Sequence, residues 1–134
     1  MANLGSNDIT IFSIDAASGA LEPLASRVGA AGGPTSVTID SQGRFAYVTN
    51  INAGNVSVFA IDAVTGALTP TSTAPAGTNP VALTLDSSGR FAYVANLSSD
   101  NVTQFAVDSA TGALTPVGGP VNAGTGPVWV AITK

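Results

Sequence analysis

The chain has 134 residues, enough for one ordinary domain, and 45% of them are hydrophobic while only 9% are charged. Only 4 Lys and Arg stand against 8 Asp and Glu, a net charge of −4, which argues against nucleic-acid binding because that requires clustered Lys and Arg. No apolar run is long enough for a membrane-spanning helix. Cysteine and histidine are absent, so disulfides, thiolate metal sites and histidine general bases are excluded, and we expect no cofactor.

Two motifs recur along the chain. In chain order, the first is Ile14–Leu21, which returns as Ile61–Leu68 and Val107–Leu114. The second is Asp40–Asn50, which returns as Asp86–Asn96. The copies are spaced 46 or 47 residues apart. This spacing lies within the range of about 40–50 residues that is typical of one four-stranded propeller blade.

Each repeat predicts four short strands. In the first complete repeat these are residues 36–40, 44–50, 55–62 and 67 to about 72. They are rich in Val, Ile, Phe, Tyr and Thr and are bounded by Gly, Asn, Asp and Pro, as strands are. No segment keeps a helical period, so the predicted class is all-β, built from four-stranded antiparallel β-propeller blades. A two-sheet sandwich is the alternative, and the recurrence of whole four-strand units disfavours it.

The predicted organisation is a single domain of two full blades and one split blade. Residues 1–34 supply the third and fourth strands of the split blade, 35–80 and 81–127 form complete blades, and 128–134 supply the first strand of the split blade. We expect a second copy to complete the split blade, most simply as a homodimer that closes a six-bladed ring. A trimer, a filament or a fragment of a longer seven-bladed propeller are the alternatives.

The strand sequences resemble a known family. Phe45–Asn50 and Phe91–Asn96 are similar to the YVTN signature, and the Asp-x-x-Thr-Gly-x-Leu hairpins resemble those of lactonase-like β-propellers. The resemblance implies a propeller fold and, as an activity, the opening of cyclic esters. It also implies that such activity relies on His, Glu and Arg in a central cleft, whereas here Glu22 is the only Glu and no His exists.

Three acidic turn residues and two arginines have structural interpretations. We expect Asp15, Asp62 and Asp108 to accept backbone N–H groups within their own turns, because Asp commonly does so in a turn that ends in Gly. Arg44 and Arg90 each follow an Asp by four residues, and we expect each Arg to pair with that Asp. We assign no catalytic or metal-binding residue.

Polar residues gather in the loops between second and third strands, which share a face of a propeller with the connections between blades. A ring of oxygens there could hold a sugar or Ca²⁺. Trp129 either lines the axis or a pocket, or fills volume at the junction of the split blade. The candidate residues of this ligand face are Asn50, Asn52, Asn96, Asp100 and Trp129.

The function predicted on these grounds is a non-catalytic propeller scaffold or binding module that assembles with itself. A lactonase-like hydrolase of cyclic esters is the alternative. Residues 1–10 have neither the basic start nor the apolar segment of a signal peptide, and the low charge favours an extracellular or cell-surface location. The ligand itself is not specified by the sequence.

Overall fold

The regular structure of the chain consists of β-strands. The computed structural model describes residues 1–133, apart from the side chains of residues 25 and 26, and every regular element in that range is a strand. The predicted all-β class is confirmed. No helix in the described range is long and apolar enough to cross a membrane.

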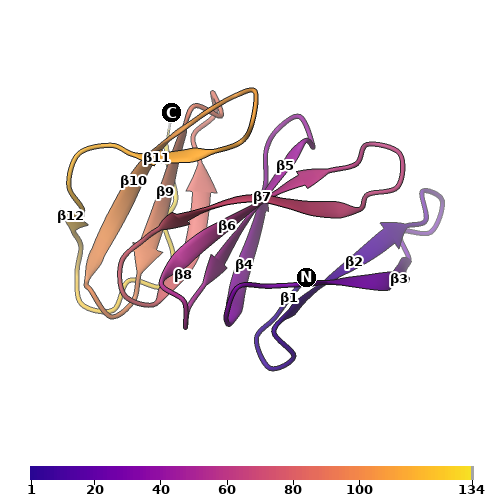
Figure 1. Cartoon of the computed structure of the whole chain (residues 1–134), viewed down its shortest axis with the longest axis horizontal. Helices are drawn as coiled ribbons and strands as arrows, with labels where there is room; N and C mark the ends of the chain where they lie inside the picture. Colours follow the sequence, from indigo (N-terminus) through magenta and orange to yellow (C-terminus); the bar gives the residue numbers. More distant parts are fainter. Residues whose placement is uncertain (134) are drawn as a thin grey trace.

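Three antiparallel sheets follow one another along the described chain and lie side by side (Figure 1). The first sheet contains β1 (Ala2–Asn3), β2 (Asp8–Ile14) and β3 (Leu21–Gly29). The second sheet contains β4 (Pro34–Ile39), β5 (Phe45–Asn50), β6 (Asn55–Ile61) and β7 (Leu68–Pro75). The third sheet contains β8 (Pro80–Leu85), β9 (Phe91–Asn96), β10 (Asn101–Val107) and β11 (Leu114–Pro116), and β12 (Val121–Asn122) also pairs with β10.

The second and third sheets have the strand order of a propeller blade, with each strand hydrogen-bonded to the next in sequence. The four strands predicted for the first complete repeat are all present. The largest shift in their bounds is at the fourth, which continues to Pro75 instead of ending near residue 72. β4 packs beside both β1 and β8, so the first strand of the second sheet lies at the centre of the row.

The strand predicted at 128–134 is not found in the single chain. Residues 127–133 belong to no strand, and residue 134 lies outside the described residues. A strand needs a neighbour to satisfy its backbone N–H and C=O groups, and this segment has none within the described chain. Its pairing with a second copy stays a prediction.

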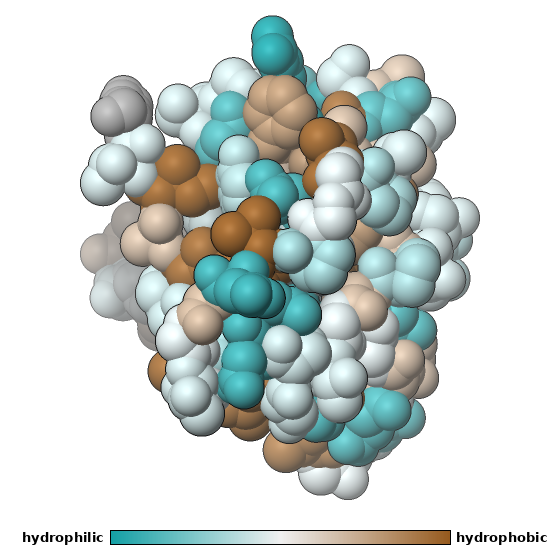
Figure 2. Space-filling model, turned by 90° about the vertical axis from the view of Figure 1, so that its left-hand side faces the viewer, coloured by the Kyte–Doolittle hydropathy of each residue, from teal (hydrophilic) through white to brown (hydrophobic). Residues whose placement is uncertain are grey.

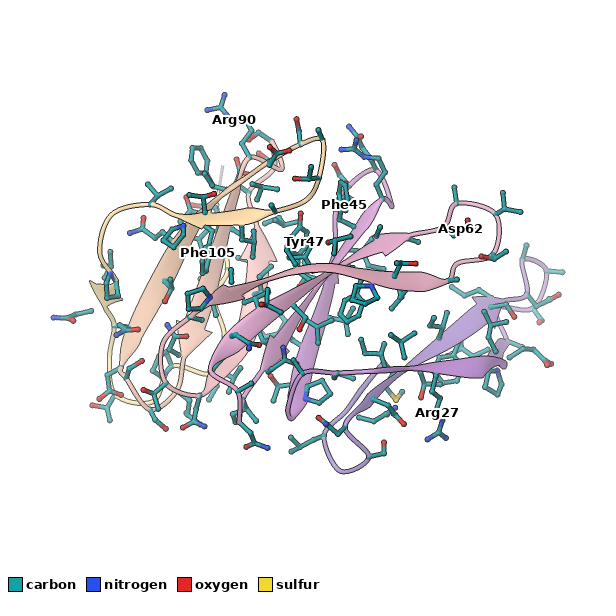
Figure 3. The ribbon with its side chains drawn as sticks, in the orientation of Figure 1. Arg27, Phe45, Tyr47, Asp62, Arg90 and Phe105 are labelled. Carbon is teal, nitrogen blue, oxygen red and sulfur yellow. The ribbon has the colours of Figure 1, made fainter. Side chains whose placement is uncertain are left out.

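The second sheet is covered on both faces, which explains why every residue of β5 is buried. On one side, Tyr47 and Val58 pack with Val94 and Phe105 of the third sheet, and Figure 3 shows Tyr47 and Phe105 between the two sheets. On the other side, the core contains Ile9, Ala46, Val48 and Phe59. A fully buried side chain of this size stabilises the fold by about 1.5–3 kcal/mol.

One turn glycine is required for this packing. A Cβ on Gly112, whose φ is +73°, would lie 2.6 Å from the ring of Phe45 in the neighbouring sheet. The Asp-x-x-Thr-Gly turn at the end of β10 therefore closes against the second sheet only with Gly at this position.

Candidate ligand-binding face

The two ends of the sheets carry different connections. We call one end the hairpin face, which comprises residues 15–20, 40–44, 62–67, 86–90 and 108–113. The other end is the loop face, which comprises the turns 4–7, 51–54 and 97–100 and the connections 30–33, 76–79 and 123–126. The loop face is the one predicted from the sequence to bind a ligand.

On the hairpin face, Asp15, Asp62 and Asp108 accept backbone N–H groups in their own turns, as predicted. The Thr65 N–H donates to Asp62 Oδ1 over 2.7 Å, and this bond is the main cause that holds the pKa of Asp62 below its ordinary value. The side-chain hydroxyl of Ser18 is the main cause at Asp15, and the backbone N–H of Thr111 is the main cause at Asp108, where the pKa is also lowered. These carboxylates are turn elements.

The two arginines of the hairpin face differ. Arg44 Nε lies 3.7 Å from Asp40 Oδ2, which confirms the predicted ion pair, and its guanidinium lies 5.3 Å from the ring centre of Phe45. Arg90 lies 5.4 Å from the ring centre of Phe91, and the described residues offer it no carboxylate within ion-pair distance. The predicted pair of Arg90 with the Asp before it is therefore not formed.

A small cavity of about 80 Å³ lies between the hairpins of the second and third sheets, and Arg44, Arg90 and Tyr47 are among the residues that line it. The Tyr47 hydroxyl is buried and has no hydrogen-bond partner among the residues that the structure describes. Burial raises the pKa of Tyr47 to about 12, with a further contribution from the nearby Asp40 carboxylate. This cavity has no room for an organic ligand.

At the base of the loop face, one asparagine in each sheet clamps the turn that follows it. Asn96 Nδ2 donates to Asn101 Oδ1 over 2.8 Å and to Thr103 Oγ1 over 2.9 Å. Asn50 and Asn3 make the same pair of bonds to the residues five and seven positions later. The repetition of this clamp in all three sheets indicates a structural role.

The clamps place two of the predicted ligand-face residues inside the protein. Neither Asn50 nor Asn96 has any exposed surface. Asn96 Oδ1 accepts the Gly77 N–H over 3.0 Å and so ties the third sheet to the connection before it. Asn50 Oδ1 is buried and has no partner within the described part of the chain. Both residues support the loop face from below and are not available on its surface.

The other three predicted residues are exposed. Asn52 lies in the turn after β5 and lines a cavity on the loop face. Asp100 lies in the turn after β9, and its Oδ1 accepts the Gly126 N–H over 2.8 Å. The Trp129 side chain is 72% exposed in the segment that belongs to no strand. The structure therefore brings none of these three together with Asn50 or Asn96 as a polar ring.

This loop-face cavity has a volume of about 620 Å³ and lies between the second and third sheets. None of the described residues that line it carries a charge. Its polar lining is formed by Asn52, Thr78, Asn79, Ser99, Asn101 and Thr103. Of these, the sequence indicated Asn52 by name and placed the connection that holds Thr78 and Asn79 on the same face. Ser99 and Thr103 carried no sequence signal beyond their place in a polar loop.

A second groove, of about 360 Å³, lies between the first and second sheets and is mainly apolar. Ile14, Leu21 and Ile39 line it and are 57–69% exposed. Among the described residues, no group of three or more acidic side chains is placed to share a metal ion. The 620 Å³ cavity is therefore the site with the size and polarity to bind a small polar molecule.

Comparison with known proteins identifies related sequences and folds. A family model described as lactonase, 7-bladed beta-propeller, matches residues 1–84 and 31–132, which together cover nearly the whole chain. A search of curated proteins finds no significant match.

Three solved structures resemble the chain closely in fold. The periplasmic gluconolactonase of Pseudomonas aeruginosa has a TM-score of 0.80 and 26% identity, over 90% of this chain and 35% of that one. A protein from Lactobacillus plantarum has a TM-score of 0.83 and 27% identity, over 90% and 37%. A candidate 6-phosphogluconolactonase from Bacteroides uniformis has a TM-score of 0.83 and 22% identity, over 92% and 36%, which supports the fold alone. The chain spans about a third of the length of each.

Proposed function

Because this chain belongs to the lactonase family of seven-bladed β-propellers, we propose that it binds a sugar lactone in the 620 Å³ loop-face cavity. The observation that carries the proposal is the uncharged polar lining of this cavity. Amide and hydroxyl groups from two sheets converge there, and the cavity volume lies in the range of about 300–1,000 Å³ of small-molecule sites.

The lining suits a neutral polyhydroxylated ring. Each hydroxyl of such a ring both donates and accepts hydrogen bonds, and Thr78, Ser99 and Asn101 offer both kinds of group. A phosphorylated lactone would require a cation, and the arginines Arg44 and Arg90 lie on the opposite face. The ligand class favoured is therefore a gluconolactone-type ring without a phosphate, as in the name of the Pseudomonas aeruginosa relative.

Ring opening of the bound lactone needs an attacking water and a base. The water oxygen bonds to the carbonyl carbon, the ring C–O bond breaks, the freed ring oxygen takes up a proton, and a hydroxy acid results. None of the described residues that line the cavity is titratable, so we propose binding of the lactone there and assign no catalytic base.

The test is a calorimetric titration of the wild type with gluconolactam, a stable lactone analogue, and we expect saturable binding. Asp100→Asn is the matched control, because Asp100 does not line the cavity and Asn7 already holds the equivalent N–H in the first connection, so it should bind gluconolactam like the wild type. Absence of gluconolactam binding by the wild type at millimolar concentration contradicts the proposal.

A second candidate function, self-assembly by completion of a blade, is favoured by one observation. Residues 127–133 belong to no strand, although Pro127 and the residues after it repeat the start of β4 and β8. The first sheet, in turn, has no strand beyond β1 within the described chain. Figure 2 shows hydrophobic patches on the side of the molecule next to the third sheet. Val128 and Trp129 are among the exposed hydrophobic residues of the chain.

Under this candidate function, residues 127–133 of one copy pair with β1 of another. Light scattering of the wild type should give the mass of a dimer, and Val128→Asp should reduce it to that of one chain. Val64→Asp is the control, because Val64 is 93% exposed at the tip of a hairpin and has no role in pairing. A wild-type monomer at micromolar concentration rules out blade completion.

A further inference from the structure

The three connections of the loop face are built alike, and this permits a comparison residue by residue. The backbone bonds Ile51 N–H to Gly33 O and Leu97 N–H to Asn79 O occupy corresponding places in two successive repeats. In each connection, the residue before the closing proline has a positive φ, which is +66° at Gly33, +55° at Asn79 and +64° at Gly126. These three residues are therefore structural equivalents.

The turn that faces each connection also has an equivalent residue. Asn7, Gly54 and Asp100 have φ values of +58°, +65° and +53°. The carbonyl oxygen of each accepts a backbone N–H at the start of the facing connection, from Ala30, Ala76 and Ala123 respectively. The sequence thus has Asn, Gly and Asp at one structural position in the three repeats.

The side chain at this position caps the connection in two of the three repeats. Asn7 Oδ1 accepts the Gly33 N–H over 2.7 Å, and Asp100 Oδ1 accepts the Gly126 N–H over 2.8 Å. In the middle repeat, Gly54 has no side chain, and the Asn79 N–H donates no hydrogen bond to any of the described residues.

The neighbouring donors of the middle connection are occupied. The Gly77 N–H donates to Asn96 Oδ1 and the Thr78 N–H donates to Ser99 Oγ, each over 3.0 Å. The Asn79 side chain is also fixed, because its Nδ2 donates to the Ile51 carbonyl over 3.0 Å. The backbone N–H of Asn79 is therefore a rigidly held donor, and both Asn79 and Gly54 line the 620 Å³ cavity.

Steric crowding does not explain why residue 54 is a glycine. A Cβ on Gly54 would meet only the Gly77 carbonyl oxygen, at an ordinary contact distance of 3.5 Å. Asn and Asp tolerate positive φ, as Asn7 and Asp100 demonstrate in this chain. An Asn at position 54 would fit, and its oxygen would cap the Asn79 N–H as in the other two repeats.

We propose that the Asn79 N–H binds the carbonyl oxygen of the lactone, which takes the place that the side-chain oxygens of Asn7 and Asp100 hold in the equivalent connections. This inference rests on the proposed function and adds the atom that recognises the ligand. A carbonyl oxygen is a good acceptor for a fixed amide donor, and the bond strengthens as negative charge develops on that oxygen when water attacks.

The test uses Gly54→Asn, which supplies a competing oxygen, and Gly54→Ala, which adds the Cβ without an oxygen. In calorimetric titrations with gluconolactam, Gly54→Asn should lose at least about tenfold more affinity than Gly54→Ala. Without ligand, hydrogen exchange at the Asn79 amide should be fast in the wild type and slow in Gly54→Asn. Asn7→Gly is the control at the first connection. It should speed exchange at the Gly33 amide and leave gluconolactam affinity unchanged.

The outcomes separate the two proposals. If the wild type binds gluconolactam and Gly54→Asn binds as well as Gly54→Ala, the role of the Asn79 N–H is overturned while lactone binding stands. If the Asn79 amide is already slow to exchange in the free wild type, the amide has another acceptor and the inference also fails. If the wild type binds no gluconolactam, lactone binding itself is overturned, and the ligand assignment falls with it.

Discussion

The hairpin face and the loop face of the sheets differ in how strictly they repeat. On the hairpin face, Asp15, Asp62 and Asp108 occupy the same turn position and accept the same kind of backbone N–H in all three sheets. On the loop face, the equivalent turn residues are different, and with Gly54 the Asn79 N–H of the middle connection has no acceptor among the described residues. A residue type that recurs in every blade has a structural role in the blade, whereas a position at which the repeats differ is a candidate for ligand binding.

The repeated asparagine clamp extends this comparison to the loop face itself, and breaking it should have the largest effect. Asn96→Ala removes the hydrogen bonds of the amide to the half-buried Asn101 and Thr103 side chains and takes away the acceptor of the Gly77 N–H. We expect the free energy of unfolding to fall by about 2–3 kcal/mol, measured by urea denaturation. Asn52→Ala, at an exposed site, is the control and should stay within about 0.5 kcal/mol of the wild type. Equal losses for the two variants would show that the clamp does not hold the loop face.

Acid should weaken the turns of the hairpin face. The pKa values of Asp15, Asp62 and Asp108 are lowered in the folded chain, so the unfolded chain binds protons more readily and stability is lost as the pH falls. The melting temperature should be level above about pH 5 and should decline below about pH 4. Asp62→Asn should reduce this decline, because Asn cannot take up the proton. An unchanged acid decline in Asp62→Asn counts against the turn carboxylate as its source.

A smaller loss of stability is expected when an arginine of the hairpin face is replaced by alanine. Arg44→Ala removes a partly exposed ion pair with Asp40 and should cost about 0.2–1 kcal/mol, with gluconolactam affinity unchanged. Arg90→Ala removes the same stacking on a Phe ring without an ion pair, so it should cost less. Loss of gluconolactam binding in Arg44→Ala at unchanged stability would show that the ligand binds on the hairpin face and not on the loop face.

The smallest effect is expected at Tyr47. Its buried hydroxyl has no partner in the described residues, so Tyr47→Phe should leave stability at neutral pH unchanged or slightly higher. The pKa of Tyr47 is raised to about 12, so in the wild type stability should fall from about pH 10, where the unfolded chain starts to ionise, up to about pH 12. Tyr47→Phe should flatten that decline. A neutral-pH loss above about 1 kcal/mol would show that the hydroxyl has a partner.

The sequence was sufficient to predict the sheets and the hairpin turns. Copies of Asp40–Asn50 and of the Asp-x-x-Thr-Gly hairpins are spaced like blades, and turn geometry depends on residues close together in the chain. Burial of Asn50 and Asn96 was not predicted. It depends on the neighbouring sheets and on connections such as the one at Gly77, which is 19 residues from its partner Asn96.

The special position of Gly54 was also not visible in the sequence. A Gly in a short loop predicts a tight turn, and that prediction is correct, since its φ is +65°. Its equivalence to Asn7 and Asp100 emerges only from the backbone bonds that each turn makes with the facing connection. Repeats of the strands and hairpins can be aligned by eye, whereas the loops between them share no residue type at this position.

The central claim, that the loop face binds a sugar lactone, is tested most directly by mapping amide chemical shifts of the wild-type chain during titration with gluconolactam. The account predicts saturable shifts at Gly54, Thr78 and Asn79, with the amides of the Asp62 and Asp108 turns unmoved. Shifts gathered at the hairpin turns, or none at millimolar gluconolactam, would contradict it.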